Sequence, residues 1–317
     1  MQCLHRRGKF QLFKKFLSKI GIGAATVNLV LDDARGRIGE EVIGKILVEG
    51  GNVEQQIDAI NVDFNMEMKL DDRTARSRIQ SLTVARNLQV KPGDKLEFPF
   101  RHLLPELPQT SRYVRYTYHT RLDIPEALDK HDFDEFGVLP NLSIATVQSA
   151  LHKLGFTEKF ESGVFNGYYQ EFEYRPMEGP FAGRISELEV VYITEANGVR
   201  MHVEIDKKGK GLLGALADSL DLDEIHFNML LTKDLLANPD ATLNTLHQTL
   251  EAELNNPSPN RYPSLPKVRG KHKHHHHHDA AVLSAGIAGY AIDDLVFDGD
   301  DSSDSGDYDS GDFGSDD

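Results

Sequence analysis

Apolar and polar side chains alternate through residues 112–125. The apolar positions are Val114, Tyr116, Tyr118, Leu122 and Ile124, and most residues between them are polar or charged. Since successive side chains of a strand point to opposite faces, this pattern predicts a strand with one buried and one solvated face. Residues 60–68 repeat the alternation over nine positions. Half-buried strands of this kind are typical of antiparallel β-sandwiches, which more often bind than catalyse.

The same period of two recurs along both halves of the chain, and a few segments show helical spacing instead. Helices are predicted at residues 13–20, at residues 212–220 and from Asp240 onward, where leucines recur every three or four positions. The predicted strands cover residues 26–32, 41–49, 60–68, 78–90, 95–100 and 112–124, then 143–153, 157–162, 168–174, 187–194, 199–206 and 225–232.

These elements predict an all-β fold of two tandem antiparallel β-sandwich domains with a few peripheral helices. The last residues are rich in Asp, Ser and Gly and cannot bury enough surface to offset the entropy of ordering, so we expect a disordered acidic C-terminal tail. The predicted divisions are a basic amphipathic helix at 1–23, a sandwich at 24–125, a connector at 126–137, a sandwich with two helices at 138–255, and at 256–317 a proline linker, a histidine tract, an apolar patch and the tail.

Composition and charge add two constraints. The chain has one cysteine, Cys3, so an intrachain disulfide is excluded, which fits a reducing compartment. Residues 1–20 carry six Lys or Arg and no acid, whereas residues 293–317 carry eleven Asp and no base. Without that tail the net charge changes from −15 to −15 + 11 = −4, so the rest of the chain is only mildly acidic.

Neither end of the chain predicts export or membrane insertion. Lysines interrupt each apolar run of residues 10–25, so no signal-peptide core forms. Residues 280–292 are apolar over about 13 positions, short of the roughly 18–20 that a spanning helix needs. We therefore expect a soluble, cytoplasmic protein.

A histidine tract near the C-terminus is the most concentrated local chemistry. Neutral imidazoles bind zinc, nickel or copper, and a flexible tract can place several nitrogens around one ion. A metal-handling protein that binds Zn²⁺ or Ni²⁺ here is one interpretation, and a segment of variable charge beside the acidic tail is another. The tract comprises His272, His274, His275, His276, His277 and His278.

The N-terminal helix also has two interpretations. Its apolar face favours packing on the first sandwich, while its lysines and phenylalanines also suit an anionic membrane surface or a partner. The residues concerned are Phe13, Lys14, Lys15, Phe16, Leu17 and Lys19. The small apolar residues of 280–292 allow homo-oligomer formation or docking to a partner, and equally a transient contact with the body of the same chain.

Other motifs predict no catalytic centre or cofactor. Two glycine-rich strings, at residues 39–45 and 209–214, lack the context of a phosphate-binding loop or a dinucleotide fold. The string His131 to Glu135 has metal-ligand residue types, but consecutive side chains rarely converge on one ion. Nucleic-acid binding is disfavoured because the basic residues gather only in the first 20 positions.

Several strings in order carry a family resemblance. They are FKKFL at 13–17, IGIGAA at 20–25, GEEV at 39–42, GGNVEQQI at 50–57, HTRLDIP at 119–125 and MHVEID at 201–206. Over roughly residues 10–255 the chain resembles the sporulation-control (SpoOM) family. The resemblance implies an arrestin-like fold of two sandwiches, no catalytic centre, and a regulatory or scaffold role.

We therefore predict a non-enzymatic, arrestin-like regulatory protein that binds protein partners on sandwich surfaces and strand edges. The charge layout adds a hypothesis: the basic N-terminal helix is covered by the aspartate-rich tail and is released by salt or by a competing partner. The competing hypothesis is the metal-handling protein described above.

Overall fold

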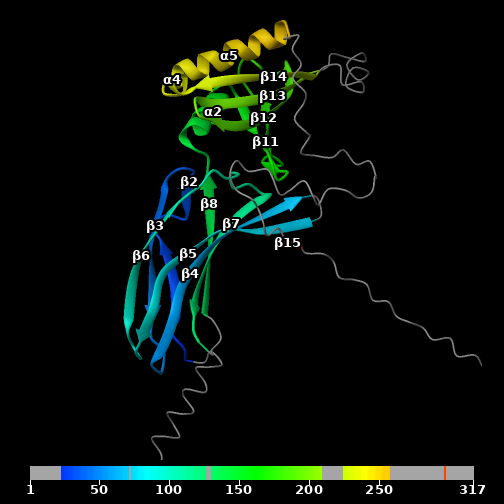
Figure 1. The fold of residues 1–317 in the computed structure, drawn as a ribbon. Coiled ribbons are helices and arrows are strands. Elements are labelled where there is room, and N and C mark those ends of the chain that lie inside the picture. The colour runs from blue at the N-terminus through cyan, green and yellow to red at the C-terminus, as the bar shows by residue number, and fades with distance from the viewer. Residues whose placement is uncertain (1–22, 71–72, 126–129, 209–223, 258–295, 298–317) are drawn as a thin grey trace, which may run out of the picture.

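The computed structural model describes residues 23–70, 73–125, 130–208, 224–257 and 296–297. These residues are mostly in antiparallel sheets, as the sequence predicts. The chain forms two parts, drawn below and above the centre of Figure 1. In the described residues no helix is both long and apolar enough to cross a membrane.

The first part is a sandwich of two sheets. The small sheet has the order β1-β3-β6, and the large sheet has the order β15-β5-β4-β7-β8-β2. All neighbours are antiparallel except β2 and β8, which are parallel. The strands are β1 (Thr26–Leu31), β2 (Arg35–Arg37), β3 (Glu41–Glu49), β4 (Gln55–Leu70), β5 (Arg73–Val90), β6 (Lys95–Leu103), β7 (Val114–Asp123), β8 (Lys130–Leu139) and β15 (Val296–Phe297).

Alternation in β4 and β7 builds the core of this sandwich. Phe64 stacks between Tyr116 and Tyr118, with ring centroids 5.3 and 4.7 Å away, and all three side chains are buried. Burying aromatic rings of this size contributes most of the hydrophobic stabilisation of such a core. The predicted inward positions of residues 112–125 are confirmed, and Thr120 is buried on the same face. Arg115, Thr117, His119, Arg121 and Asp123 lie on the outer face.

A buried histidine joins the two sheets along the β5–β6 side. His102 Nδ1 lies 2.8 Å from the Tyr118 hydroxyl, and its Nε2 lies 3.0 Å from Gln80 Oε1. Burial lowers the pKa of His102 to about 4, so the ring is neutral at physiological pH. A neutral ring can donate from one nitrogen and accept at the other, which satisfies both contacts in the core.

The second part is one antiparallel sheet with helices on one face. The order is β10-β11-β12-β13-β14, and β9 pairs with β11. Helices α2 and α5 pack on the buried face, so among the described residues a helical layer stands where the sequence predicted a second sheet (Figure 1). The elements are α2 (Leu142–Lys153), β9 (Phe156–Glu158), β10 (Val164–Phe165), β11 (Gln170–Pro176), β12 (Ile185–Glu195), β13 (Gly198–Lys207), β14 (Glu224–Thr232), α4 (Lys233–Leu236) and α5 (Pro239–Asn255).

Two sequence predictions need correction here. Residues 143–153, predicted as a strand, form α2; Asn141 caps it by accepting a hydrogen bond from the Ile144 N–H, and Val147 and Leu151 continue its buried face. Residues 126–137, predicted as a connector, include most of β8, which pairs with β7 inside the large sheet. The helix predicted at 212–220 lies outside the described residues.

The two parts are joined by hydrogen bonds and by one buried ring. Gln109 and Gln170 exchange two bonds of 2.6 and 2.8 Å, and Ser111 Oγ donates to the Gly163 carbonyl at 2.7 Å. Phe165 of β10 is 2% exposed and belongs to the core of the first sandwich. The second part therefore completes the core of the first.

Replacing Phe165 by alanine removes this ring and leaves a cavity at the junction. We expect Phe165→Ala to lower the free energy of unfolding by about 3–4 kcal/mol. The matched control is Phe160→Ala, because Phe160 is 76% exposed. This variant should lower the free energy of unfolding by less than about 1 kcal/mol. Chemical denaturation of both variants checks this, and equal losses would contradict the role of Phe165.

Candidate functional site

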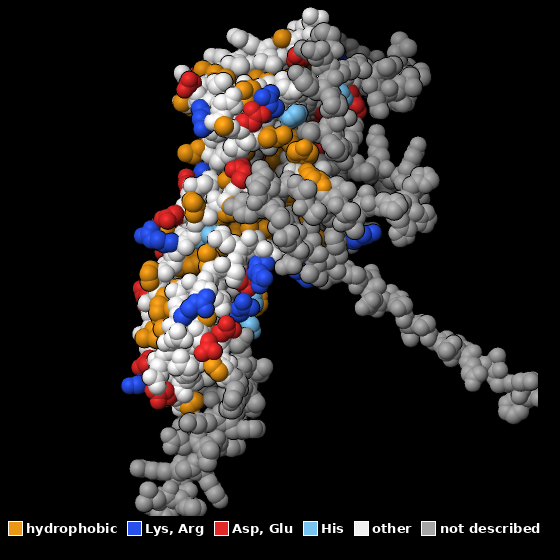
Figure 2. Space-filling model, in the orientation of Figure 1, with side chains coloured by type: hydrophobic (Ala, Val, Ile, Leu, Met, Phe, Trp, Pro, Cys, Tyr) orange, Lys and Arg blue, Asp and Glu red, His pale blue; other side chains and the backbone are white. Residues whose placement is uncertain are grey.

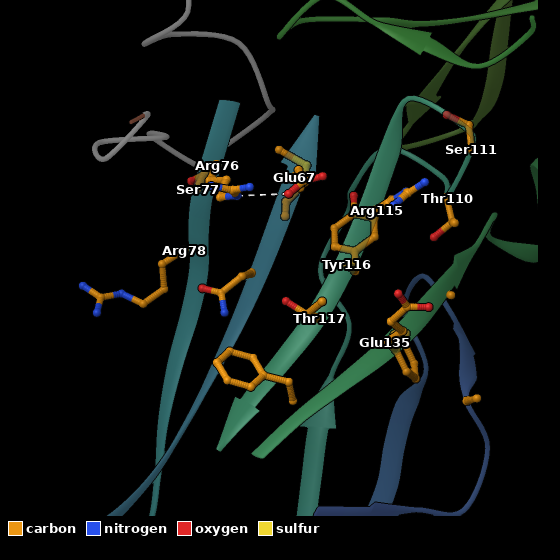
Figure 3. A pocket seen from close by; sticks show the side chains of 16 residues that line it. Glu67, Arg76, Ser77, Arg78, Thr110, Ser111, Arg115, Tyr116, Thr117 and Glu135 are labelled. Carbon is orange, nitrogen blue, oxygen red and sulfur yellow. Dashed lines mark hydrogen bonds and ion pairs between the residues drawn. The ribbon is translucent and has the colours of Figure 1, made fainter. Parts of the chain in front are cut away.

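The outer face of the large sheet carries a groove of about 1140 Å³ (Figure 3). It is lined by residues of β4, β5, β7 and β8 and by the segment that holds Thr110 and Ser111. The outward positions that line it are Asn65, Glu67, Arg76, Arg78, Arg115, Thr117, Phe133 and Glu135. The groove exists because the alternation that buries one face places these side chains together on the other.

Opposite charges meet across neighbouring strands in this groove, and the positive charges exceed the negative. Glu67 lies opposite Arg76 on one side and Arg115 on the other, and Arg76 Nε contacts a Glu67 carboxylate oxygen at 3.0 Å. Arg78 and Glu135 complete the charged lining, so three arginines face two glutamates. In the space-filling view, side chains of both signs are interspersed on the visible face of this domain (Figure 2).

Asp63 forms ion pairs with two arginines beside the groove. Its side chain is buried and accepts a 2.5 Å hydrogen bond from the Ser81 hydroxyl. Arg121 Nη2 lies 3.5 Å and Arg78 Nη1 lies 3.9 Å from the other carboxylate oxygen. A buried carboxylate with two arginine neighbours and a hydroxyl donor is well compensated, so Asp63 holds Arg78 at the edge of the groove.

Two histidines are in contact at the far end of this face. His119 Nε2 lies 2.8 Å from His131 Nδ1, and the His119 ring stacks on Phe133 with centroids 4.2 Å apart. Burial, and next the charge of His131, lower the pKa of His119. The neutral form of the His119 ring is thereby favoured.

The string His131 to Glu135 does not converge on one point. His131 and Phe133 lie on the outer face, whereas Asp132 and Asp134 point into the sandwich. Asp132 accepts a 2.8 Å hydrogen bond from the Leu29 N–H of β1. Burial and the neighbouring Asp132 raise the pKa of Asp134 to about 6.

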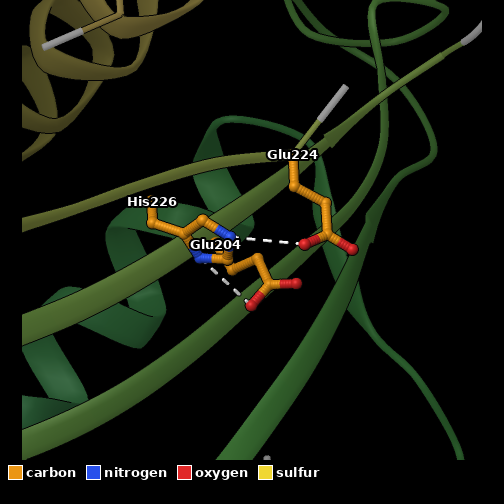
Figure 4. A group of neighbouring side chains, drawn as sticks. All are labelled: Glu204, Glu224 and His226. Atoms are coloured by element: carbon orange, nitrogen blue, oxygen red, sulfur yellow. Dashed lines mark ion pairs between the residues drawn. The ribbon is translucent and has the colours of Figure 1, made fainter. Parts of the chain in front are cut away.

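A second group of titratable side chains lies on the sheet of the second part (Figure 4). His226 Nδ1 faces Glu204 and its Nε2 faces Glu224, each at 3.3 Å. The three side chains have metal-ligand types within 4.8 Å of one another. However, the two carboxylates lie beside opposite nitrogens of one ring, whereas a metal ion binds one nitrogen of an imidazole, so the arrangement suits a side-chain network better than a metal site.

The same face is strongly acidic. In register across four strands lie Glu173, Glu189, Glu204 and His226. Burial, followed by the charges of Glu171, Glu204, Asp206 and Glu173, raises the pKa of Glu189 to about 8. Lys159 offsets part of this charge by contacting Glu173 at 2.5 Å and also Glu187.

Comparison with known proteins agrees with this architecture. The model of the SpoOM protein family matches residues 13–209. The chain belongs to the SpoOM family. The sporulation-control protein spo0M of Bacillus subtilis (strain 168) is 32% identical over 218 residues, which cover 65% of this chain and 84% of that protein. The crystal structure of Spo0M from Bacillus subtilis matches with a TM-score of 0.55 at 25% identity, over 73% of this chain and 99% of the other.

The site residues predicted from the sequence lie outside the described residues. This holds for the membrane or partner contacts Phe13, Lys14, Lys15, Phe16, Leu17 and Lys19, and for the metal ligands His272, His274, His275, His276, His277 and His278. The SpoOM match includes the first set and ends before the second. Of the tail, Val296 and Phe297 are described, and they form β15 beside β5.

Sequence reasoning did not identify the groove or the acidic face. The groove combines residues from four strands, and no single strand carries a recognisable motif. One signal was present: residues 73–90 hold four arginines and no acid. For the acidic face, the signal was a glutamate or aspartate at alternate positions of three predicted strands.

The raised pKa of Glu189 predicts a pH-dependent cost to stability. The folded protein keeps this proton up to about pH 8, whereas the unfolded chain releases it near its ordinary value of about 4.5. Stability is therefore lost as pH rises through this range. Because Glu189 is only partly buried, solvent screening reduces the effect of its full pKa shift. We expect its ionisation to lower the free energy of unfolding by about 2 kcal/mol.

We expect Glu189→Gln to be more stable than the wild type by about that amount at pH 9 and nearly equal to it at pH 5. Glu195→Gln on the same strand is the control, because a hydrogen bond from Arg200 lowers the pKa of Glu195. That control should give no gain at pH 9. Denaturant titrations at both pH values measure the difference, and a gain that does not change with pH would contradict the assignment.

Proposed function

We propose that this SpoOM-family chain is a non-catalytic, arrestin-like regulatory or scaffold protein of the cytoplasm. It binds a protein partner on the outer face of the large sheet. The observation that supports this most is the groove of about 1140 Å³, which is lined by Arg76, Arg78 and Arg115 together with other polar and apolar side chains. A concave surface with a few convergent charged groups is a common form of recognition site.

The chemistry of the groove favours binding over reaction. Among the described residues that line it there is no histidine or cysteine to serve as base or nucleophile. Three of its hydroxyl groups have structural partners. Ser111 Oγ donates to the Gly163 carbonyl and accepts from the N–H groups of Tyr113 and Val114. Thr110 Oγ1 accepts from the Val138 N–H, and the Tyr116 hydroxyl donates to the Pro108 carbonyl. A hydroxyl that fixes the junction between the two parts is poorly placed to attack a substrate.

The charge of the groove indicates the partner. Three arginines against two glutamates leave a positive surface on a chain whose net charge is −15. Arginine binds carboxylates in two-point geometry, and complementary charge sets specificity and association rate. Phe133, which is 68% exposed, adds an apolar contact at one end. The surface therefore suits a protein segment with acidic side chains and an apolar residue.

Reversing one groove charge tests this proposal. We expect Arg115→Glu to reduce partner capture from a native lysate at least about tenfold, because it places a like charge against the acidic partner. Arg101→Glu is the matched control: it makes the same charge change on the small sheet, where Arg101 is exposed and pairs with Glu41. Quantitative mass spectrometry of captured proteins measures the effect.

Capture should also weaken as salt rises, because the partner is held by screened charges. A partner retained equally by Arg115→Glu and Arg101→Glu contradicts the proposal. Matching thermal unfolding curves for the two variants show that both are folded.

A further inference from the structure

β5 lies on the outer side of the large sheet next to β15, and its backbone is more regular at one end than at the other. Opposite β4 the register shifts twice, so that Ile79 and Val84 are extra residues on β5. Such β-bulges bend and twist a strand and are a common protection of sheet edges against further pairing. From Arg73 to Arg78 the register with β4 is continuous. Residues 85–90 also keep a constant register, but there Asn87 has a φ of 54°, in the left-handed region, so the strand is not regularly extended at that end. The regular edge suited to another strand is therefore residues 73–78.

The added strand lies on this regular edge. β15 pairs antiparallel with β5, with Val296 opposite Arg76 and Phe297 opposite Ala75 (Figure 1). The backbone of a segment about 220 residues further along the chain thus extends the large sheet by one strand. Main-chain pairing of this kind is how many domains recognise extended peptides.

The charges of β5 and of the sequence around β15 are opposite in sign. β5 carries Arg73, Arg76, Arg78 and Arg86 and no acidic residue, and these four side chains are exposed. In the sequence, Val296 and Phe297 stand between aspartates at positions 293, 294 and 298. An extended acidic segment with an apolar pair at its centre is therefore complementary in charge to the regular edge.

Arg76 belongs to both the edge and the groove. It lines the groove, contacts Glu67 and lies opposite Val296. A strand on the edge is thus adjacent to the groove that we propose as the partner site. One ligand can occupy both surfaces.

We infer that the β5 edge at residues 73–78 is a strand-addition site for an extended acidic segment of a protein partner, and that the chain's own β15 occupies it as a competitor. The inference rests on the proposed function and adds the class of partner and its regulation. A tethered competitor acts at an effective concentration of about millimolar, so it weakens a partner strand of similar sequence at least about tenfold.

A peptide supplied in trans tests the inference. The probe is a fluorescein-labelled peptide of residues 291–300, measured by anisotropy with the full-length chain. The variant Val296→Pro with Phe297→Pro removes both N–H donors of β15 and so disables the internal strand. We expect the peptide to bind this variant at least about tenfold more tightly than the wild type.

Charge variants in the same proline background locate the binding site. Arg73→Glu with Arg76→Glu should abolish peptide binding, and Arg73→Gln with Arg76→Gln should weaken it. Arg86→Glu is the matched control, because Arg86 lies on the same strand beyond both bulges. A peptide that itself carries the two prolines should not bind.

Three results would overturn the inference: no binding to the proline variant, equal binding to this variant and the wild type, or equal loss with the Arg73/Arg76 and Arg86 variants. The proposed function fails independently, through partner capture. If Arg115→Glu loses the partner but the peptide shows no edge binding, the groove stands and the edge does not. If the peptide binds as expected while Arg115→Glu retains the partner, the edge site stands and the groove does not.

Discussion

Burial of one face of β4 and β7 is the constraint on which the rest of the first domain depends. Phe64, Tyr116 and Tyr118 are almost fully enclosed, so these two strands cannot change register without exposing large rings. The same register fixes the outer face, where Glu67 lies between Arg76 and Arg115. The apolar core and the charged groove are therefore two results of one alternation.

The edges of the large sheet are controlled in different ways. On one side, Asp132 of β8 accepts a hydrogen bond from the Leu29 N–H of β1 and so links the large sheet to the small sheet. On the other, the bulges at Ile79 and Val84 and the left-handed backbone of Asn87 leave residues 73–78 as the regularly extended stretch of β5. β15 pairs within that stretch. In our proposal, the protected parts of the edge thereby direct a partner strand to residues 73–78.

Local periodicity predicted the parts of the fold in which each strand has one dry face, such as β4, β7 and β13. It failed at β8, because Asp132 and Asp134 point inward and interrupt the hydrophobic pattern. It also failed at α2, where Ile144, Val147 and Leu151 are helically spaced and Asn141 is the cap that was overlooked. The groove could not be predicted, because its residues become neighbours only through the pairing of four strands.

The central claim is that the outer face of the large sheet binds the partner. Arginine-selective labelling with phenylglyoxal, read by mass spectrometry on the full-length chain with and without its captured partner, tests this directly. The account predicts that the partner protects Arg76, Arg78 and Arg115 and leaves Arg101 on the small sheet fully reactive. Unchanged labelling of all three groove arginines in the complex would contradict it.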